Sequence, residues 1–460
     1  MAADHPLFAE YYAKGKARRQ ICHRVDQAEV VLAPGRDPVA VLAASSQGRV
    51  PELIPLRYGR MQASPFAFFR GMAMMQAADL ANRPSSGIVL QLCGDAHLMN
   101  YGFYASPERN LVFDINDFDE THPGPWEWDV KRLAVSLVLA ARSRGFSEVA
   151  AAEAVRLAVR TYRHRTHHFA CMGQMDIWYS RISYGDLLDM AQDPALRETL
   201  LKLAERARNR TSERLLPKIT ADENGLLRLK DNPPVLFHTG DTTLIRSVTW
   251  PAGSDWREQA EAMLQTYIGT LKEDRAELAR RFRLVDLAFK VVGVGSVGTR
   301  CLVALLQDSY DTPLFLQLKE ARASVLEPFT QGCIHGNQGK RVVFGQRLMQ
   351  AASDLFLGWT RGPDGCDYYV RQLRDMKVTI AAEDFSVETL TAYGQACAWA
   401  LARAHSKSGG RAAEIAGYLG QTSRFEDALA LYATRYADQA EADYESFRRA
   451  VRDGVLPASD

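Results

Sequence analysis

The segment CGDAHLMN (residues 93–100) comes directly after a short apolar run, IVLQL (residues 88–92), which predicts a buried β-strand. Within this segment, Asp95 precedes Asn100 by five residues. Phosphoryl transfer needs a carboxylate that orients or deprotonates the acceptor hydroxyl, together with oxygen ligands that hold Mg²⁺ against the phosphates. A carboxylate and an amide on one loop after a strand meet part of both needs.

The segment FDINDFDE (residues 113–120) concentrates acidic side chains after a second predicted strand at residues 110–113. A single Asp or Asn in such a position is more often a turn former, because its side chain hydrogen-bonds nearby backbone. Four acids interleaved with Phe and Ile must bring some carboxylates to a buried face, which is unfavourable without a cation or another partner. As a group they therefore predict a cation site. These residues are Asp114, Asp117, Asp119 and Glu120.

The run GVGSVG (residues 293–298) is a candidate phosphate-binding segment. No Gly-Lys-Ser/Thr follows it, which excludes a P-loop. A dinucleotide-binding fold would need a helix to open inside the run, whereas residues 301–306 and 314–318 are apolar and predict two strands around a polar turn. We therefore expect a glycine-rich hairpin followed by a strand that ends near Lys319. Taken alone, Lys319 fits a solvated lysine at a strand end equally well.

The loop at residues 93–100 resembles the H-G-D-x-H-x-x-N loop of aminoglycoside and choline kinases, which belong to the protein-kinase-like superfamily. The resemblance implies that Asp95 is the catalytic base and that Asn100 binds the metal, while His97 is the supporting histidine. Cys93 stands where this family usually has His. That position mostly supports the loop, so the substitution does not exclude activity.

The same resemblance assigns the second metal ligand to Asp117, at the head of the D-F-G-like motif DFD (residues 117–119). Asp114 is the alternative, because it lies nearer the usual distance from the metal-binding asparagine. The cofactors implied are ATP and Mg²⁺.

The glycine hairpin and the strand after it resemble the small lobe of kinases, in which a glycine-rich loop covers the phosphates of ATP and a strand lysine pairs with them. The lysine is then Lys319, and its carboxylate partner is expected at Glu327 on the next helix, with Glu320 as the second choice. Residues 368–373 (YYVRQL) are expected to form the hinge strand against which adenine packs. The loop residues assigned to the nucleotide are Gly293, Gly295, Ser296 and Gly298.

The order of these segments differs from that of ordinary kinases, because the catalytic loop at residue 93 precedes the glycine loop at residue 293. One cyclic rotation accounts for the order, since residues 401–405 (LARAH) resemble the end of the helix that ordinarily precedes the catalytic loop. Circular permutation is tolerated where the termini lie close together and the cut falls in a loop. We therefore expect an α+β, protein-kinase-like two-lobe fold in circularly permuted order, with extra helices.

This arrangement predicts four regions. Residues 1–85 form an N-terminal helical and loop segment, and residues 86–283 form a large-lobe-like region with the catalytic loop and a helical insert. Residues 284–378 form a nucleotide-binding, small-lobe-like region, and residues 379–460 supply C-terminal helices that complete the large lobe. The strongest single helix is expected at residues 127–144, where apolar residues recur at helical spacing.

The chain as a whole resembles a bacterial family catalogued as domain of unknown function 2252. The resemblance covers most of the length and implies no particular activity, so the expected chemistry depends on the segments above. Arg60 and Arg70 flank the first of the matching motifs and are candidates for binding a substrate phosphate or carboxylate, although each alone is more simply a structural ion-pair partner. The matching motifs are SPFAFFRG (residues 64–71), LCGDAH (92–97), FDINDFDE (113–120) and PGPWEWD (123–129).

The charge balance, the amino-terminal sequence and the cysteine spacing argue against several classes of protein. The 56 Lys and Arg residues nearly cancel the 55 Asp and Glu residues, so no global field attracts nucleic acid or an anionic membrane. The amino terminus is polar and lacks the apolar core of a signal peptide, and the seven cysteines include no Cys-x-x-Cys pair. We expect a cytoplasmic protein whose partners are a nucleotide and an unidentified acceptor, with no nucleic acid and no membrane.

The leading hypothesis is an ATP- and Mg²⁺-dependent phosphotransferase that acts on a hydroxyl-bearing small molecule or protein. One alternative is a nucleotide-binding pseudokinase without turnover. Another is a kinase-fold nucleotidyltransferase, which transfers AMP with the nucleotide bound in the flipped orientation. A metal-dependent hydrolase that uses only the acidic cluster would leave the glycine hairpin and Lys319 without a role.

Overall fold

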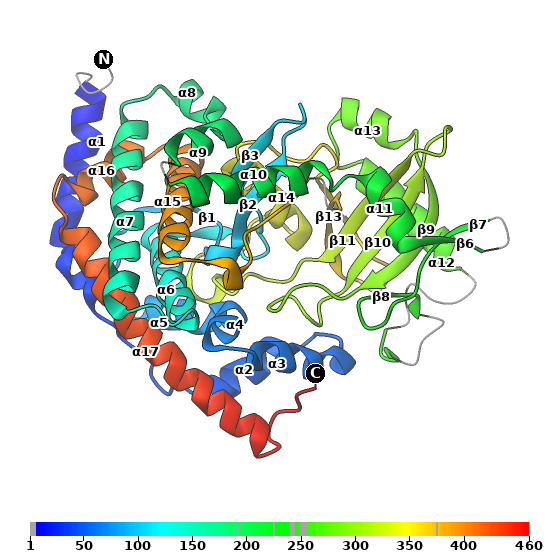
Figure 1. The fold of residues 1–460 in the computed structure, drawn as a ribbon, viewed down its shortest axis with the longest axis horizontal. Coiled ribbons are helices and arrows are strands. Elements are labelled where there is room, and N and C mark those ends of the chain that lie inside the picture. Colours follow the sequence, from blue (N-terminus) through cyan, green and yellow to red (C-terminus); the bar gives the residue numbers. More distant parts are fainter. Residues whose placement is uncertain are drawn as a thin grey trace.

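The chain folds into a mixed α+β structure in which a helical part and a sheet part lie side by side (Figure 1). Its α+β class confirms the prediction. Within the described residues, no helix is both long enough and apolar enough to cross a bilayer. The computed structural model describes residues 6–191, 193–223, 226–239, 244–248, 250, 255–373 and 376–459.

The sheet part is a six-stranded antiparallel sheet with helices packed beside it. Its strands are β8 (Leu236–Phe237), β9 (Arg283–Lys290), β10 (Cys301–Gln307), β11 (Pro313–Glu320), β12 (Gly358–Arg361) and β13 (Asp367–Gln372), and the helices are α11 (Ser212–Ile219), α12 (Trp256–Ile268), α13 (Glu273–Ala279) and α14 (Gln338–Met349). The strand order is β12-β13-β11-β10-β9-β8. Because strand side chains alternate between faces, Leu302 and Ala304 pack with α12 and α13, whereas Val303 and Leu305 pack with α11.

Strands β9 and β10 form the predicted glycine-rich hairpin. They pair in antiparallel register, with Leu302 opposite Phe289. Residues 293–298 between them contain turns and no helix, which rules out the dinucleotide-binding arrangement. Strand β11 returns alongside β10 and brings Lys319 opposite Cys301.

The helical part is built around long helices that share one core. Helix α6 confirms the helix expected at residues 127–144. Helix α15 is capped at its start by Ser386, whose side chain accepts from the amide of Thr389, and at its end by Gly410 in the left-handed region (φ 58°). The helices of this part are α6 (Glu127–Ser143), α7 (Glu148–Ala170), α8 (Gln174–Tyr179), α9 (Tyr184–Met190), α10 (Pro194–Arg208), α15 (Val387–Gly409), α16 (Ala412–Leu419) and α17 (Arg424–Arg452).

The helices of the N-terminal segment pack on the C-terminal helices: α1 lies along α16, and α2 and α4 contact α17 (Figure 1). Arg36 ties the two ends of the chain together, because its guanidinium group pairs with both Asp79 and Asp443. These helices are α1 (Pro6–Ala17), α2 (Pro38–Ser46), α3 (Ile54–Gln62), α4 (Pro65–Arg70) and α5 (Ala73–Ala81).

Short strands near the middle of the molecule carry the two polar segments (Figure 1). Strand β1 pairs with β4, and residues 93–100 follow β1; β3 lies between β2 and β5, and the acidic segment follows β3. The strands predicted at residues 88–92 and 110–113 are thereby confirmed. These strands are β1 (Val89–Leu92), β2 (Tyr101–Ala105), β3 (Leu111–Ile115), β4 (His122–Pro125) and β5 (Ile182–Ser183). Two further short strands, β6 (Thr220–Glu223) and β7 (Leu226–Leu229), pair with each other at the edge of the sheet part, beside β9.

Asp114, the alternative metal ligand, has a structural role instead. It is 0% exposed in β3. Its carboxylate pairs with Arg403 of α15 (Nη2–Oδ2 2.8 Å). It also accepts hydrogen bonds from the amides of Ile115 (2.9 Å) and Ala351 (2.7 Å). The carboxylate is enclosed and both of its oxygens already accept hydrogen bonds, so these contacts indicate a structural role for Asp114 rather than the metal-binding one predicted from the sequence.

Replacement of Arg403 tests this structural role. We expect Arg403→Met to lower the free energy of unfolding by about 3 kcal/mol, because it leaves the Asp114 carboxylate buried without its cation. Urea denaturation followed by circular dichroism measures the change. Arg448→Met is the matched control, since the Arg448–Glu445 pair is more than half exposed on both sides (55% and 59%) and its loss costs about 1 kcal/mol or less. Equal losses in the two variants would contradict the assignment.

Candidate active site

The loop at residues 93–100 is held by a buried carboxylate from α6. Asp129 accepts hydrogen bonds from the amides of Cys93 (2.9 Å) and Gly94 (3.0 Å). His405 of α15 contacts the same carboxylate (Nε2–Oδ2 3.2 Å). Gly94 adopts a positive φ of 85°, and a Cβ atom there would lie 2.0 Å from the carbonyl oxygen of Glu120. Glycine is therefore required where the loop passes the acidic segment.

Asp95 faces a cavity and is oriented by an arginine. Its Oδ1 accepts a hydrogen bond from Nε of Arg132 (2.8 Å), and its side chain is 17% exposed. Asn100 donates from Nδ2 to the Asp95 carbonyl oxygen (2.8 Å), which directs its Oδ1 away from that contact. The loop thus presents one carboxylate and one amide oxygen together, as predicted for Asp95 and Asn100.

His97 lies beside Asp95 in a buried position. Its Nε2 is 3.7 Å from Asp95 Oδ2, and its Nδ1 accepts a hydrogen bond from the amide of Met99 (3.2 Å). Burial lowers the pKa of His97 to about 4, despite the opposing charge of Asp95. His97 is therefore neutral near pH 7, and its observed contacts are those of a supporting residue.

The acidic segment meets the sheet part at Asp119. Lys319 of β11 pairs with Asp119 Oδ2, and the Tyr369 hydroxyl of β13 donates to Oδ1 (2.7 Å). Ser296 of the glycine loop donates to the same carboxylate (3.3 Å). The Asp119 carboxylate therefore joins β11, β13 and the glycine loop, all in the predicted nucleotide-binding region, to the segment after β3.

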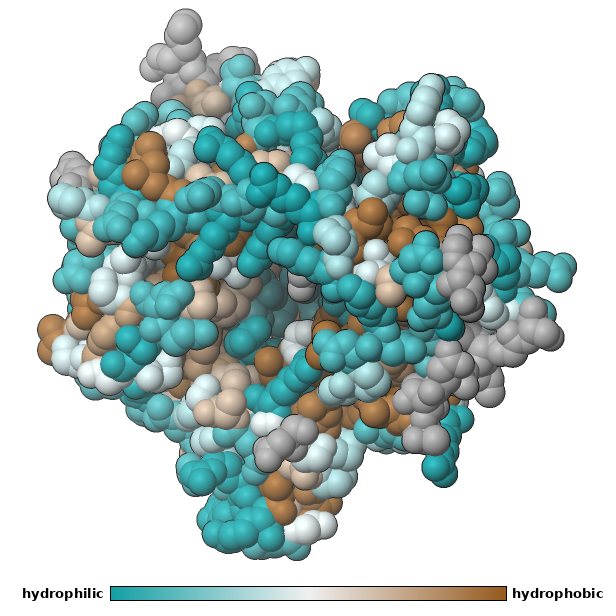
Figure 2. Space-filling model, turned by 45° about the vertical axis from the view of Figure 1, so that its right-hand side comes forward, coloured by the Kyte–Doolittle hydropathy of each residue, from teal (hydrophilic) through white to brown (hydrophobic). Residues whose placement is uncertain are grey.

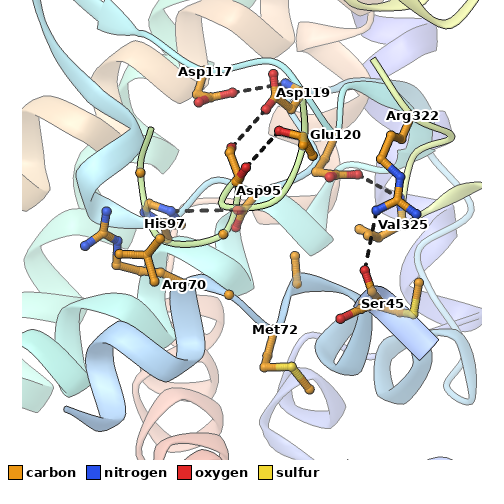
Figure 3. Close-up of a pocket in the computed structure, with 18 of the residues that line it drawn as sticks. Ser45, Arg70, Met72, Asp95, His97, Asp117, Asp119, Glu120, Arg322 and Val325 are labelled. Atoms are coloured by element: carbon orange, nitrogen blue, oxygen red, sulfur yellow. Dashed lines mark hydrogen bonds and ion pairs between the residues drawn. The ribbon is translucent and has the colours of Figure 1, made fainter. Parts of the chain in front are cut away.

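Asp117 lies next to this contact and is less enclosed. Its Oδ2 is 3.6 Å from Lys319 Nζ, and its side chain is 28% exposed. Burial alone would raise the pKa of Asp117, but Lys319, Arg371 and Lys377 together hold this pKa well below its usual range. Asp117 is thus a charged carboxylate at a cavity surface (Figure 3).

The glycine loop lies against the N-terminal segment. Gly293 and Gly298 have positive φ angles of 68° and 87°. A Cβ atom on Gly295 would lie 3.1 Å from the carbonyl oxygen of Arg70. Arg60, predicted as a substrate-binding residue, donates to the Gly293 carbonyl oxygen (2.6 Å) and so anchors the loop. Arg70, in contrast, lines the cavity that contains Asp95.

Glu327 does not occupy the place predicted for it. It lies in a 3-10 helix (Glu327–Phe329) and accepts a hydrogen bond from the amide of Cys333 (3.0 Å). Lys319 pairs with Asp117 and Asp119 instead. Glu320, the second choice, pairs with Arg300 (3.2 Å). The predicted pairing of Lys319 with Glu327 is therefore wrong.

Two cavities adjoin at the acidic segment, where Asn116 lines one and Asp117 lines the other. We call the first, of about 200 Å³, the loop cavity; it is lined by the loop at residues 93–100, the glycine loop and residues 44–74 (Figure 3). The second, of about 360 Å³, is the hinge cavity; it lies between β2 and the end of β13, beside the predicted hinge strand. Figure 2 shows a hollow near the centre of one face, with hydrophilic side chains along its upper edge.

A metal site has to be shared with a ligand. Among the described residues, no three His, Cys, Asp or Glu side chains come close enough to hold a metal ion by themselves. Magnesium bound to nucleotide phosphates needs only one or two protein carboxylates, because phosphate oxygens and water complete its octahedron. Asp117 and Asn100 both line the loop cavity and offer such oxygens. Their residue types are those that such a shared site would need.

Several cations at these cavities were not predicted from the sequence. Arg132 could have been found from the sequence, because three polar residues recur at helical spacing inside the apolar helix α6. They are Asp129, Arg132 and Ser136, and all three are buried. Ser136 also accepts a hydrogen bond from the amide of Leu98 (2.9 Å), so this whole polar stripe supports the loop. The other cations come from separate segments with no such pattern. They are Arg49, Arg57, Arg109, Lys290, Arg322, Arg371 and Lys377.

A family model described as an uncharacterized protein conserved in bacteria (DUF2252) matches residues 49–450. The chain belongs to this family. The DUF2252 match includes both the loop at residues 93–100 and Lys319, and it confirms the predicted resemblance to this family. No curated protein and no solved structure matches the chain.

The buried position of His97 predicts a pH dependence of stability. With a folded-state pKa of about 4 and an ordinary value of 6.5, the neutral imidazole contributes stability that is full above pH 6.5 and is lost as the pH falls towards 4. The loss amounts to about 3 kcal/mol. We expect His97→Asn to remove most of this dependence, as measured by urea denaturation at several pH values.

The exposed His168 of α7 supplies the control, because His168→Asn changes a histidine that is not enclosed. The assignment is contradicted if both variants keep the wild-type loss of stability between pH 6.5 and 4.

Proposed function

We propose that this DUF2252 chain is an ATP- and Mg²⁺-dependent phosphotransferase with a circularly permuted, protein-kinase-like arrangement. The observation that carries the proposal is that Asp95 and Asp117 line one cavity with the glycine loop, while the buried Lys319 pairs with Asp117 and Asp119 beside that cavity. Lys319 and Asp119 stand 200 residues apart in the chain, yet they pair. A carboxylate, metal-binding oxygens, a lysine and a glycine loop are the groups that phosphoryl transfer requires.

In this proposal, the Asp95 carboxylate orients the acceptor hydroxyl and takes its proton as the hydroxyl oxygen bonds to the γ-phosphorus of ATP. The bond from that phosphorus to the bridging oxygen breaks, and ADP leaves with the oxygen. Lys319 and the backbone amides of the glycine loop hold the phosphates, and Arg132 keeps Asp95 in position. Asp117 and Asn100 would hold Mg²⁺, which would supply the charge that neutralises the phosphate oxygens.

Support for the permuted order comes from α15. In ordinary kinases the corresponding helix leads directly into the catalytic loop. Here His405, near the end of α15, contacts Asp129, and Asp129 in turn holds the amides of Cys93 and Gly94. The end of the helix and the start of the loop are therefore neighbours in space although 312 residues separate His405 from Cys93 (405 − 93). A cut in the chain at this point explains both facts.

A second candidate function, nucleotidyl transfer, is favoured by the cations of the hinge cavity. Arg371 donates to Gln317 Oε1 (3.1 Å) and to the Asn116 carbonyl oxygen (3.2 Å), which Lys377 also contacts (3.1 Å). Among the described residues, the hydrogen-bond acceptors of Arg371 and Lys377 are thus neutral oxygens. Burial, followed by the neighbouring Arg371, lowers the pKa of Lys377 to about 7. A flipped nucleotide would place its terminal phosphates on these cations and turn its α-phosphate towards Asp95.

Labelled ATP separates the two reactions. We expect the wild-type chain, with Mg²⁺ and a bacterial small-molecule extract, to move label from the γ-phosphate to an acceptor, as detected by chromatography. Asp95→Asn should lower the rate by about 10²–10⁴-fold, because the variant cannot accept the hydroxyl proton. The control is Asp274→Asn, at a side chain of α13 that is 65% exposed.

Three other outcomes of this experiment would contradict phosphoryl transfer or favour an alternative function. Failure of ATP to bind in the presence of Mg²⁺ would contradict the proposal. Binding without any movement of label would favour a nucleotide-binding module, and transfer of only the α-label would favour nucleotidyl transfer.

The hinge cavity supplies an independent test of orientation. If the adenine base occupies it, as phosphoryl transfer requires, Lys377→Gln should change the affinities for ATP and for adenosine by about the same factor. If Lys377 instead binds phosphate, its removal would lower the affinity for ATP by about tenfold and leave the affinity for adenosine unchanged. Isothermal titration calorimetry with both ligands measures the difference, and Lys202→Gln on the exposed face of α10 is the control. A selective loss of ATP affinity would support the flipped orientation.

A further inference from the structure

Four arginines line the loop cavity, and none of them forms an ion pair within the described part of the chain. Their hydrogen-bond acceptors are neutral. Arg49 donates to the Val297 carbonyl oxygen (2.7 Å), and Arg57 donates to Ser46 Oγ (2.9 Å). The four arginines are Arg49, Arg57, Arg70 and Arg322.

These guanidinium groups retain unused donors and repel one another. Burial, followed by the charge of Arg322, lowers the pKa of Arg49 to about 10; burial, followed by the charge of Arg49, lowers that of Arg57 to about 9. Both remain charged near pH 7. The Nε atoms of Arg57 and Arg70 are buried and have no hydrogen-bond partner among the described residues. Such a cluster is suited to an anion, which would relieve the repulsion and accept the free donors.

The carboxylates of the loop cavity attract these arginines from a distance but form no ion pair with them in the described part of the chain, because each has a closer partner. These partners are Arg132 for Asp95, Lys319 for Asp117 and Asp119, Arg300 for Glu320, and the Val325 amide for Glu120. Burial also raises the pKa of Glu120, which makes it a weaker counter-charge.

The arginines surround the proposed catalytic carboxylate. In Figure 3, Arg70 lies beside His97 on one side of Asp95, and Arg322 lies on the other side, near Ser45. Arg322 reaches the N-terminal segment, where it donates to the carbonyl oxygens of Gln47 and Ser45. The proposed nucleotide groups come from other elements: Lys319 from β11 and Asp117 from the end of β3.

We propose that the loop cavity binds a small anionic acceptor, through a phosphate or carboxylate group held by Arg49, Arg70 and Arg322, with its hydroxyl directed at Asp95. This inference rests on the proposed phosphotransferase function and names the acceptor class. A cationic acceptor, such as an amine sugar or choline, would be repelled by the same side chains. The volume of about 200 Å³ suits a compact molecule.

Binding of inorganic phosphate to the full-length chain tests the site without ATP. We expect saturable binding of labelled phosphate in equilibrium dialysis, with Arg322→Gln lowering the affinity by about tenfold through loss of a charge-assisted hydrogen bond. Arg70→Gln is the second variant, so that a folding defect in one does not decide the result. The control is Arg448→Gln on the exposed surface of α17.

Lys319→Met separates the acceptor site from the nucleotide site. We expect it to weaken Mg²⁺–ATP binding and to leave phosphate binding unchanged, whereas Arg322→Gln should do the reverse. The acceptor-site proposal is overturned if phosphate does not bind, if neither arginine variant weakens it, or if both kinds of variant weaken both ligands equally. Loss of ATP binding together with normal, arginine-dependent phosphate binding would instead contradict only the phosphotransferase function.

Discussion

Lys319 places a buried ammonium group against the Asp119 carboxylate, and this contact joins the sheet part to the segment that follows β3. The buried Lys319 ammonium group (4% exposed) is expensive to desolvate, so its pair with the partly exposed Asp119 (24%) is stable only with further hydrogen bonds. Tyr369 and Ser296 supply them on the carboxylate side. The positions of β11, β13 and the glycine loop are therefore coupled through one side chain. A nucleotide phosphate that took Lys319 would release Asp119 and alter all these contacts together.

The cleft shows an asymmetry between its acids and its bases. Its carboxylates already have partners, whereas Arg49, Arg57 and Arg322 of the loop cavity and Arg371 and Lys377 of the hinge cavity donate to neutral oxygens. A hydrogen bond from a charged donor to a neutral oxygen stabilises the structure less than an ion pair between two charged groups does. A ligand with several negative charges would give these cations charged acceptors, which a neutral or cationic ligand would not. Nucleotide phosphates and an anionic acceptor both meet that condition.

The fold was predictable where the apolar pattern was local. Strands β10 and β11 are long apolar runs, and α6 has a clear helical period; β2 was missed because all five of its residues are buried and show no alternation. Asp114 and Asp117 could not be separated, since sequence spacing does not say which face of the chain meets the cavity. The partner of Lys319 was also misjudged, because a pairing across 200 residues depends on tertiary packing.

The difference between local sequence patterns and tertiary packing also matters for the choice of the proposed acceptor. The groups proposed for the chemistry lie in a few short segments, and their residue types indicate a reaction class. The arginines of the loop cavity instead come from two distant regions, residues 49–70 and residue 322, and only the packing of the N-terminal segment against the glycine loop brings them together. The proposed reaction class therefore follows from local patterns, whereas the charge of the proposed acceptor site depends on how the first 85 residues close the cleft.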